Sequence, residues 1–286
     1  MSSPRHLLIM AGGASSRMKK SLAQYDLDQS TKDEAQKHHK CLIPLGEKKR
    51  PLLYYHLLQA KKVGVSEVTI ITPVDNSGFI DFLATGMAQE VMGDLRIKLV
   101  QQELAAGAAK PLGTADAIQQ AMDKNEGLKE NAFVVLNGDN LYSIKSLSVL
   151  FSSPEKQNAL IGYDRNGLNF PTGRIQKFAV LQTDKNHYLR DIVEKPTLEI
   201  VEKAKDHRGN IRVSMNIFRL YGPTIYPYLK HCPIDPERQE KELPTAVKRC
   251  VQEDPTAFLM YPLSEHVPDL TAAGDIAVMT TQLDSF

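Results

Sequence analysis

A turn of small and basic residues follows the first apolar run of the chain, residues 7–11, and could bind phosphate. Its members are Gly12, Gly13, Ser15, Ser16 and Arg17. The glycines let the backbone turn sharply and approach another molecule closely. Small serines leave the neighbouring amides uncovered, and arginine adds a fork of donors. Such a turn at a strand end suits nucleotide phosphates, although a purely structural glycine turn explains the motif alone equally well.

This turn matches neither of two standard phosphate loops. The P-loop has four residues between its glycines and then Gly-Lys-Ser/Thr, whereas Met18 and Lys19 follow Arg17 here. The dinucleotide-binding fingerprint needs three glycines spaced G-x-G-x-x-G, and only the adjacent pair is present. A phosphate loop at this position would therefore belong to another class.

Two aspartates are candidates for metal ligands. Asp139 follows the apolar residues 132–136 and the pair Asn137-Gly138. A carboxylate at a strand end, facing a phosphate loop, is a ligand of the kind that Mg²⁺ requires. The same residues also make a good turn in which the aspartate caps a helix. Asp269 has two readings as well: a cap for the last helix, or a second carboxylate for the metal.

Two lysines and one glutamate are candidates for substrate contacts. Lys40 precedes an apolar segment, where a lysine is either solvated or functional. Glu194 and Lys195 end a strand just before Pro196. Because proline cannot extend a strand into a central ladder, we expect this pair at a sheet edge or at the mouth of a site. The alternative is that the two residues form an ordinary solvent-exposed pair without a role in binding.

Gly113 and Thr114 begin a predicted helix with small side chains, so that a flat ring or a sugar could approach the backbone. The alternative is a glycine turn with Thr114 as the N-cap. Hydrolase triads have no support, because the histidines form no HxxxH pair and no serine lies in a nucleophile elbow.

Strands and helices alternate along the first half of the chain. We predict strands at residues 7–11, 68–72, 97–100 and 132–136, and helices at 52–63, 79–83 and 114–122. This alternation predicts an α/β fold, a Rossmann-like and mostly parallel sheet with helices on both faces. Ligands bind such sheets beyond the carboxyl ends of the strands, where residues 12–17 and 137–139 both lie.

The second half has a different pattern, which predicts a smaller mixed-sheet lobe. Longer, antiparallel strands are expected at residues 174–182, 188–193 and 211–221, and helices at 243–251 and 272–283. We therefore expect a nucleotide-binding half at 1–140 and a substrate-binding lobe with the C-terminal helices at 141–286, within one compact domain. The polar stretch between Arg17 and Lys40 is predicted to be a mobile or part-helical insertion over the site.

The composition is that of a soluble globular protein, with 286 residues, 42% hydrophobic and 24% charged residues. A net charge of +1 gives no general field for nucleic acid or for an anionic membrane. Scattered Cys41, Cys232 and Cys250 read as reduced thiols of a cytoplasmic protein. The first apolar stretch is too short for a signal peptide or a membrane span.

Each motif has more than one reading, but their order resembles the sugar-1-phosphate nucleotidyltransferases, also called nucleotide-sugar pyrophosphorylases. The similarity extends from Leu7 to about Asp275. It rests on the glycine turn, Lys40, the glutamine before Leu112-Gly113-Thr114-Ala115, Gly138-Asp139-Asn140, Glu194-Lys195-Pro196 and the late Asp269. The fold that the resemblance implies is that of the nucleotide-diphospho-sugar transferases.

The resemblance also implies roles for individual residues. Nucleotide binding would fall to Ala11, Gly12, Gly13, Ser15, Ser16, Arg17, Gln101, Gly113 and Thr114, with Gln102 as an alternative to Gln101. Catalytic roles would fall to Arg17 at the β- and γ-phosphates, Lys40 at the α-phosphate and Lys195 at the sugar phosphate. The remaining substrate contacts would be Asn137, Glu194 and Asn216, and Mg²⁺ would be held by Asp139 and Asp269.

The activity implied is a Mg²⁺-dependent, in-line attack of a sugar-1-phosphate on the α-phosphate of an NTP, which gives an NDP-sugar and pyrophosphate. One alternative is a related transferase with a non-sugar phosphate acceptor, of the molybdopterin guanylyltransferase or CMP-transferase type. Another is a non-catalytic, nucleotide-sugar-binding regulatory protein. The partners expected are these small molecules. The base, the sugar and the oligomeric state stay open.

Overall fold

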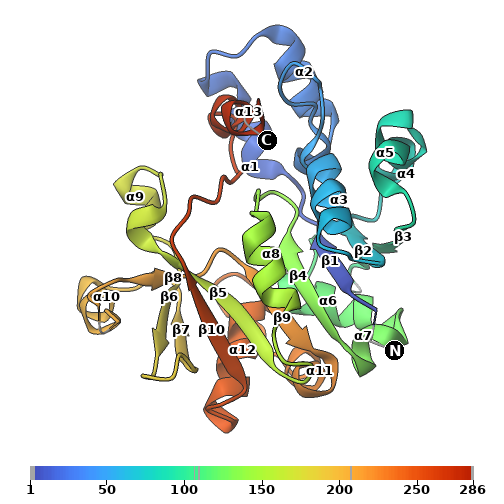
Figure 1. Cartoon of the computed structure of the whole chain (residues 1–286). Coiled ribbons are helices and arrows are strands. Elements are labelled where there is room, and N and C mark those ends of the chain that lie inside the picture. Colours follow the sequence, from blue (N-terminus) through green and yellow to red (C-terminus); the bar gives the residue numbers. More distant parts are fainter. Residues whose placement is uncertain (1–3, 106, 109, 207, 285–286) are drawn as a thin grey trace.

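One twisted sheet runs through the computed structural model of the chain, which describes residues 4–105, 107–108, 110–206 and 208–284 (Figure 1). Its strands are β1 (His6–Met10), β2 (Glu67–Thr72), β3 (Arg96–Gln101), β4 (Ala132–Asn137), β5 (Asn158–Asp164), β6 (Val180–Thr183), β7 (Leu189–Val193), β8 (Arg212–Val213), β9 (Ile217–Tyr221) and β10 (Phe258–Leu263). Their order is β3-β2-β1-β4-β9-β5-β8-β6-β7, and β10 pairs with β5.

Helices connect these strands. The α-helices are α1 (Ser16–Ser21), α2 (Gln29–Lys37), α3 (Leu52–Lys62), α4 (Ser77–Ala84), α5 (Gly86–Met92), α6 (Thr114–Asp123), α7 (Glu126–Glu130), α8 (Ile144–Phe151), α9 (Thr172–Ile175), α10 (Leu198–Lys203), α11 (Gly222–Lys230), α12 (Leu243–Glu253) and α13 (Asp275–Asp284). Three short 3₁₀ turns are η1 (Leu22–Gln24), η2 (Lys40–Leu42) and η3 (Arg165–Gly167).

The predicted parallel sheet of the first half is confirmed. Strand β1 lies between β2 and β4, and both of these pairs, like β2 with β3, are parallel. In this register Met10 is level with Asn137, so the turn after β1 and the turn after β4 emerge side by side at the carboxyl edge. The sheet therefore brings together residues 12–17 and 137–139, as the sequence predicts.

Helices cover both faces of the sheet, which is also as predicted. Successive residues of a strand point to opposite faces. On β1, Leu7 and Ile9 belong to a buried cluster that includes side chains of α3, α8 and α13. Leu8 belongs to a second cluster with side chains of α6, α11 and α12. The near-continuous apolar run of this strand is thus explained by burial on both sides.

The second half adds the antiparallel strands that were expected, through β9 on β4 and β6 on β7. Two predicted strands are corrected. Residues 174–182 begin in helix α9, and only Val180–Thr183 are extended, because Arg174 is held by acidic side chains of the C-terminal segment. Residues 211–221 form two strands, since Asn216 has a φ of +56° and breaks the ladder. The division into two halves at residue 140 stays a prediction. Strands from before and after this residue belong to the same sheet.

The stretch between Arg17 and Lys40 is largely helical and contains α1, η1 and α2. Two contacts attach it to the segment before α13: the Ala273 amide donates to Ser21 Oγ at 2.9 Å, and the Tyr25 ring covers Gly274. A Cβ on Gly274 would lie 2.4 Å from that ring. Figure 1 shows α2 and α13 at the same end of the molecule. The predicted insertion is therefore docked on the C-terminal part of the chain.

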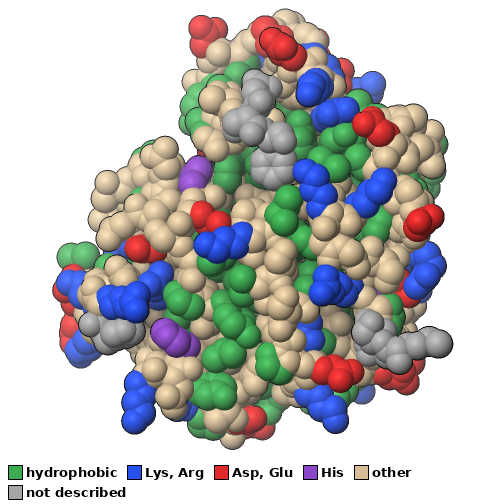
Figure 2. Space-filling view, in the orientation of Figure 1, with side chains coloured by type: hydrophobic (Ala, Val, Ile, Leu, Met, Phe, Trp, Pro, Cys, Tyr) green, Lys and Arg blue, Asp and Glu red, His purple; other side chains and the backbone are tan. Residues whose placement is uncertain are grey.

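The charged side chains on the surface are mixed in sign, in line with the net charge of +1, and the three cysteines are free thiols. Figure 2 shows Lys and Arg side chains interspersed with Asp and Glu on the face drawn. Cys41, Cys232 and Cys250 are buried and form no disulfide. Within the described ranges, no helix has the length and apolar character needed to cross a membrane.

Candidate active site

Within the described part of the chain, three amide groups of the turn after β1 have no hydrogen-bond acceptor. The Ala11 amide still donates to Ile71 O at 2.8 Å, which is the last sheet bond on this side. Among the described residues, none accepts a hydrogen bond from the amides of residues 12–14. Ser15 then adopts the left-handed conformation, with a φ of 54°, and its carbonyl accepts from Lys19 to begin α1. Successive free amides beside a helix start form an anion-binding concavity.

A cavity of about 470 Å³ lies against this turn. The predicted residues that line it are Ala11, Gly12, Gly13, Ser16, Arg17, Lys40, Gly113, Thr114, Asn137 and Asp139. It is also lined by residues that the sequence did not single out, namely Met10, Ala14, His39, Ile71, Lys110, Pro111, Ala117 and Glu240, and by Gln102. The fold therefore gathers most of the predicted nucleotide site around one hollow.

Gln102, the alternative, lines the cavity, and Gln101 does not. The Gln102 side chain is buried, and its Nε2 donates to Gly113 O at 3.1 Å. A Cβ on Gly12 would lie 2.7 Å from Gln102 Oε1, so a larger residue there would require the Gln102 side chain to move. Gln101 instead donates to Val74 O at 2.7 Å from an exposed position. Of the two glutamines, Gln102 has the geometry to face a bound base.

Gly113 starts α6 in a conformation that favours glycine, with a φ of +104°. A Cβ there would lie 2.6 Å from Lys241 O. The N-cap reading of Thr114 is wrong: Gly113 is the N-cap, and Thr114 Oγ1 accepts from the Leu243 amide at 2.8 Å. The start of α6 is thereby fastened to the start of α12.

We expect Gly113→Ala to lower the free energy of unfolding by more than about 1 kcal/mol, because the new methyl group meets both a backbone clash and an unfavourable φ. Gly86→Ala is the matched control, since a Cβ there meets nothing within 4 Å. Urea unfolding of both variants checks this. Equal midpoints would contradict the role given to the Gly113 backbone.

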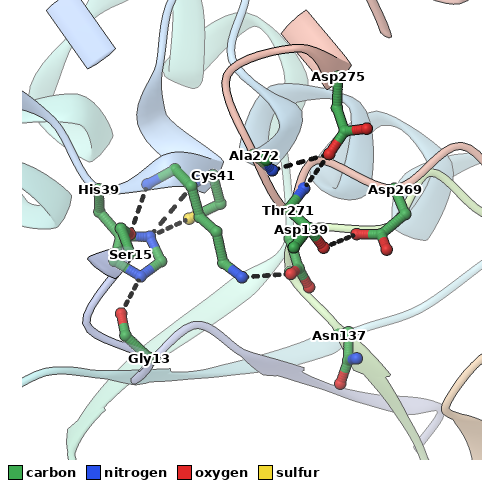
Figure 3. A network of polar contacts seen from close by, with 12 residues as sticks. Gly13, Ser15, His39, Cys41, Asn137, Asp139, Asp269, Thr271, Ala272 and Asp275 are labelled. Carbon is green, nitrogen blue, oxygen red and sulfur yellow. Dashed lines mark hydrogen bonds and ion pairs between the residues drawn. The ribbon is translucent and has the colours of Figure 1, made fainter. Parts of the chain in front are cut away.

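Asp139 and Asp269 are brought together by their backbones. The Leu270 amide donates to Asp139 O at 2.8 Å, and Asn140 forms an isolated bridge with Asp269. Figure 3 shows the two carboxylates on neighbouring segments. Lys40 Nζ donates to Asp139 Oδ2. Lys40 therefore lies between these carboxylates and the turn of residues 12–17, which is called the phosphate turn below. Lys40, Asp139 and Asp269, which are far apart in the sequence, are therefore close together in the fold.

Asp269 is held by two donors. Its carboxylate accepts from Thr271 Oγ1 at 2.8 Å and from the Arg174 guanidinium at 2.6 Å. Burial, followed by the negative charge of Asp139, raises the pKa of Asp269. The cap reading is wrong for this residue, because its carboxylate accepts from Thr271 and Arg174, whereas α13 begins six residues later, at Asp275. Asp275 itself accepts from the Thr271 amide in the segment before the helix (Figure 3). Asp269 is thus free of a capping role.

The carboxylate pair suits a hard cation. Within the described part of the chain, no three His, Cys, Asp or Glu side chains gather to hold a metal by themselves. Mg²⁺ is commonly bound by one or two carboxylates and completed by substrate phosphates and water. Burial is the largest cause of the raised pKa of Asp269, and the negative charge of Asp139 is the second; a bound cation would relieve this repulsion between the carboxylates. The donor set therefore fits Mg²⁺.

Arg17 lies in the first turn of α1 and lines the cavity. Among the described residues, no carboxylate pairs with its guanidinium. Arg17 is thus available to an anionic ligand at the turn, whereas Lys40 already contacts Asp139.

Of the predicted substrate contacts, Asn137 lines this cavity, whereas Glu194, Lys195 and Asn216 are not among its lining residues. Glu194 follows β7, which is the edge strand of the sheet as expected, and pairs with Arg238 at 3.3 Å. Burial is the main cause that raises the pKa of Glu194. Lys195 and Asn216 both have left-handed backbones, with φ values of 46° and 56°. Two such non-glycine residues are the kind of strained position found at functional sites.

Three histidines, His6 and His56 in the core and the half-buried His39, make stability depend on pH. Burial lowers the pKa of His6, His39 and His56 to about 4, from 6.5. The unfolded chain then binds more protons between these values, so stability is full above pH 6.5 and is lost as the pH falls towards 4. We expect a slope of up to about 1.4 kcal/mol per pH unit for each histidine. Urea midpoints measured from pH 7.5 to 5 test this; an unchanged midpoint would contradict it.

Comparison with known proteins gives the same family and the same fold. The family model for "Nucleotidyl transferase" matches residues 7–257. The glucose-1-phosphate adenylyltransferase of Enterobacter sp. (strain 638) is 24% identical over an alignment of 301 positions, which covers 98% of this chain. The chain spans 64% of the length of that relative.

Solved structures share the architecture. A UDP-glucose pyrophosphorylase complexed with UDP-glucose has a TM-score of 0.72 at 15% identity, over 99% of both chains. A Bacillus anthracis structure described as a glucose-1-phosphate thymidylyltransferase, in complex with a sucrose, has a TM-score of 0.68 at 20% identity, over 99% of this chain and 96% of the other. At these identities the likeness shows the fold.

Proposed function

The chain belongs to the nucleotidyl transferase family, and from this premise we propose that it joins an NTP to a sugar-1-phosphate. The observation that carries the proposal is the cavity between the free amides of residues 12–14 and the contact of Lys40 with Asp139. One side of the cavity offers donors for a triphosphate. The other offers a cation and a carboxylate at the level where the α-phosphate would lie.

The reaction forms one bond and breaks one. An oxygen of the sugar phosphate attacks the α-phosphorus, the bond from that phosphorus to the bridging oxygen of the β-phosphate breaks, and pyrophosphate leaves with the electron pair. The nucleophile is already ionised at pH 7, so the chain needs no general base. The difficulty is to hold two polyanions in line, which is a task of positioning and charge neutralisation.

Different residues of the cavity would bind the phosphates, the base and the sugar phosphate. The amides of residues 12–14 and the Arg17 guanidinium would hold the β- and γ-phosphates. Lys40 would share its ammonium group between Asp139 and the α-phosphate. Gln102 and Gly113 would bound the base, and Asn137 would contact the substrate from the end of β4.

Mg²⁺ is the cofactor proposed, held by Asp139 and Asp269. When bound, it would supply positive charge at the phosphates as the transition state develops. Asp139 would then contact both the metal ion and the Lys40 ammonium group. Thr271 and Arg174 keep Asp269 in place beside it.

On the acceptor side, we propose that Lys195 meets the sugar phosphate and that Glu194 accepts a hydrogen bond from a sugar hydroxyl. Asn216, at the break between β8 and β9, would complete the contacts. The left-handed backbones of Lys195 and Asn216 are the structural support for this assignment.

A pyrophosphate-release assay tests the proposal. Each NTP is combined with a set of sugar-1-phosphates and, separately, with non-sugar phosphate acceptors. Activity with one sugar-1-phosphate is the result we expect. Activity with another acceptor alone would replace it by the non-sugar transferase reading, and tight binding without turnover would replace it by a regulatory protein.

A further inference from the structure

We propose that His39 is a positioning residue that sets the phosphate turn by holding the carbonyl of Gly13. The proposal rests on the proposed function, because it assigns the turn to the triphosphate. His39 Nε2 lies 2.7 Å from Gly13 O, across 26 residues of chain. Figure 3 shows the ring directed at this carbonyl.

The ring itself is fixed, and its protonation state follows from its neighbours. The Cys41 amide donates to Nδ1 at 3.3 Å, so Nδ1 is the acceptor and Nε2 carries the hydrogen. Burial keeps the pKa of His39 at about 4, and the ring is therefore neutral at pH 7. Phe79 packs on it with ring centroids 5.4 Å apart. His39 thus donates a single, directed hydrogen bond to the turn.

Holding the Gly13 carbonyl also orients the next amide. In a trans peptide the C=O and the following N–H point in opposite directions. The Ala14 N–H is therefore turned away from His39, and it is one of the three amides that donate to none of the described residues. A carbonyl oxygen that rotated towards a triphosphate would repel it, and the His39 bond prevents that rotation.

A second bond holds the turn from the same short segment. The Lys40 amide donates to Ser15 Oγ at 3.1 Å, beside the left-handed Ser15 backbone. Residues 39 and 40 thus contact two positions of the turn, while the Lys40 side chain reaches Asp139. The docked insertion between Arg17 and Lys40 therefore returns the chain to the phosphate turn and fixes its shape.

Two substitutions separate this role from a merely structural one. His39→Gln places an amide Nε2 at about the reach of the imidazole Nε2, whereas the shorter His39→Asn cannot reach Gly13 O. We expect His39→Asn to raise the Kd and the KM for the NTP about tenfold, as for the loss of one well-placed hydrogen bond. The KM for the acceptor should not change, and His39→Gln should restore most of the NTP affinity.

His38→Asn is the matched control, because His38 is the neighbouring residue and pairs with Glu34 at 3.0 Å, away from the turn. NTP binding is measured by calorimetry without acceptor, alongside thermal unfolding. Equal NTP affinity for His39→Asn and wild type, or equal losses in His39→Asn and His39→Gln, would overturn the proposal. A wild-type protein that binds no NTP would overturn the proposed function itself, so the two failures are distinguishable.

Discussion

Asp139→Ala is expected to reduce pyrophosphate release about a hundred- to a thousandfold at saturating Mg²⁺, since the loss of one electrostatic group at a reacting centre has an effect of this order. Asp139 lines the cavity just after β4, and its carboxylate contacts Lys40. Its loss removes a metal ligand and leaves Lys40 without the partner that directs its side chain. Both effects act on the charge around the α-phosphate.

Asp139→Asn sharpens this test, because it keeps the shape of the side chain and removes its charge. We expect both variants to lose Mn²⁺ affinity, measured by electron paramagnetic resonance without substrates. Asp75→Ala is the control, since Asp75 is exposed and contacts Ser77 only through local turn bonds. Near-wild-type turnover of Asp139→Ala would remove this residue from the metal site.

Lys40→Met is expected to cost about 2–4 kcal/mol of transition-state stabilisation, a fall in kcat/KM of roughly 30- to 1000-fold. The ammonium group contacts Asp139 beside the turn of residues 12–17, and methionine keeps the apolar stem of the lysine. Because Lys40 and Asp139 contact each other, the double variant should lose less than the sum of the single losses.

Lys37→Met controls for the loss of a charge from the same segment, since Lys37 is exposed at the end of α2. The kinetic constants of all the variants are compared at one ionic strength. Strict additivity of the Lys40 and Asp139 losses would contradict their joint action. An unchanged kcat/KM for Lys40→Met would remove the lysine from the reaction.

The sheet could be predicted because burial leaves a clear pattern. Residues 7–11 and 132–136 are apolar without alternation, as strands covered on both faces must be, and they form β1 and β4. Since parallel strands share a carboxyl edge, the phosphate turn and Asp139 could be placed together. The two strands could thus be predicted from local sequence patterns, and the closeness of the two turns from a general rule of sheet topology.

Features that depend on distant contacts could not be predicted. The choice between Gln101 and Gln102 is one of strand register, where a shift by one residue reverses the direction of the side chain. Residues 174–176 have a strand-like pattern, but the ion pairs of Arg174 with Asp269 and Asp275 hold them in a helical turn. His39 belongs to no motif, because its partner is a backbone carbonyl far along the chain.

The central claim is that a sugar-phosphate oxygen attacks the α-phosphorus of an NTP in the cavity beside residues 12–14. The most direct test uses a sugar-1-phosphate labelled with ¹⁸O in its phosphoryl oxygens, followed by mass spectrometry of the products. The label should be retained in the NDP-sugar, and the pyrophosphate released should be unlabelled. Labelled pyrophosphate, or the absence of an NDP-sugar with every NTP, would contradict the claim.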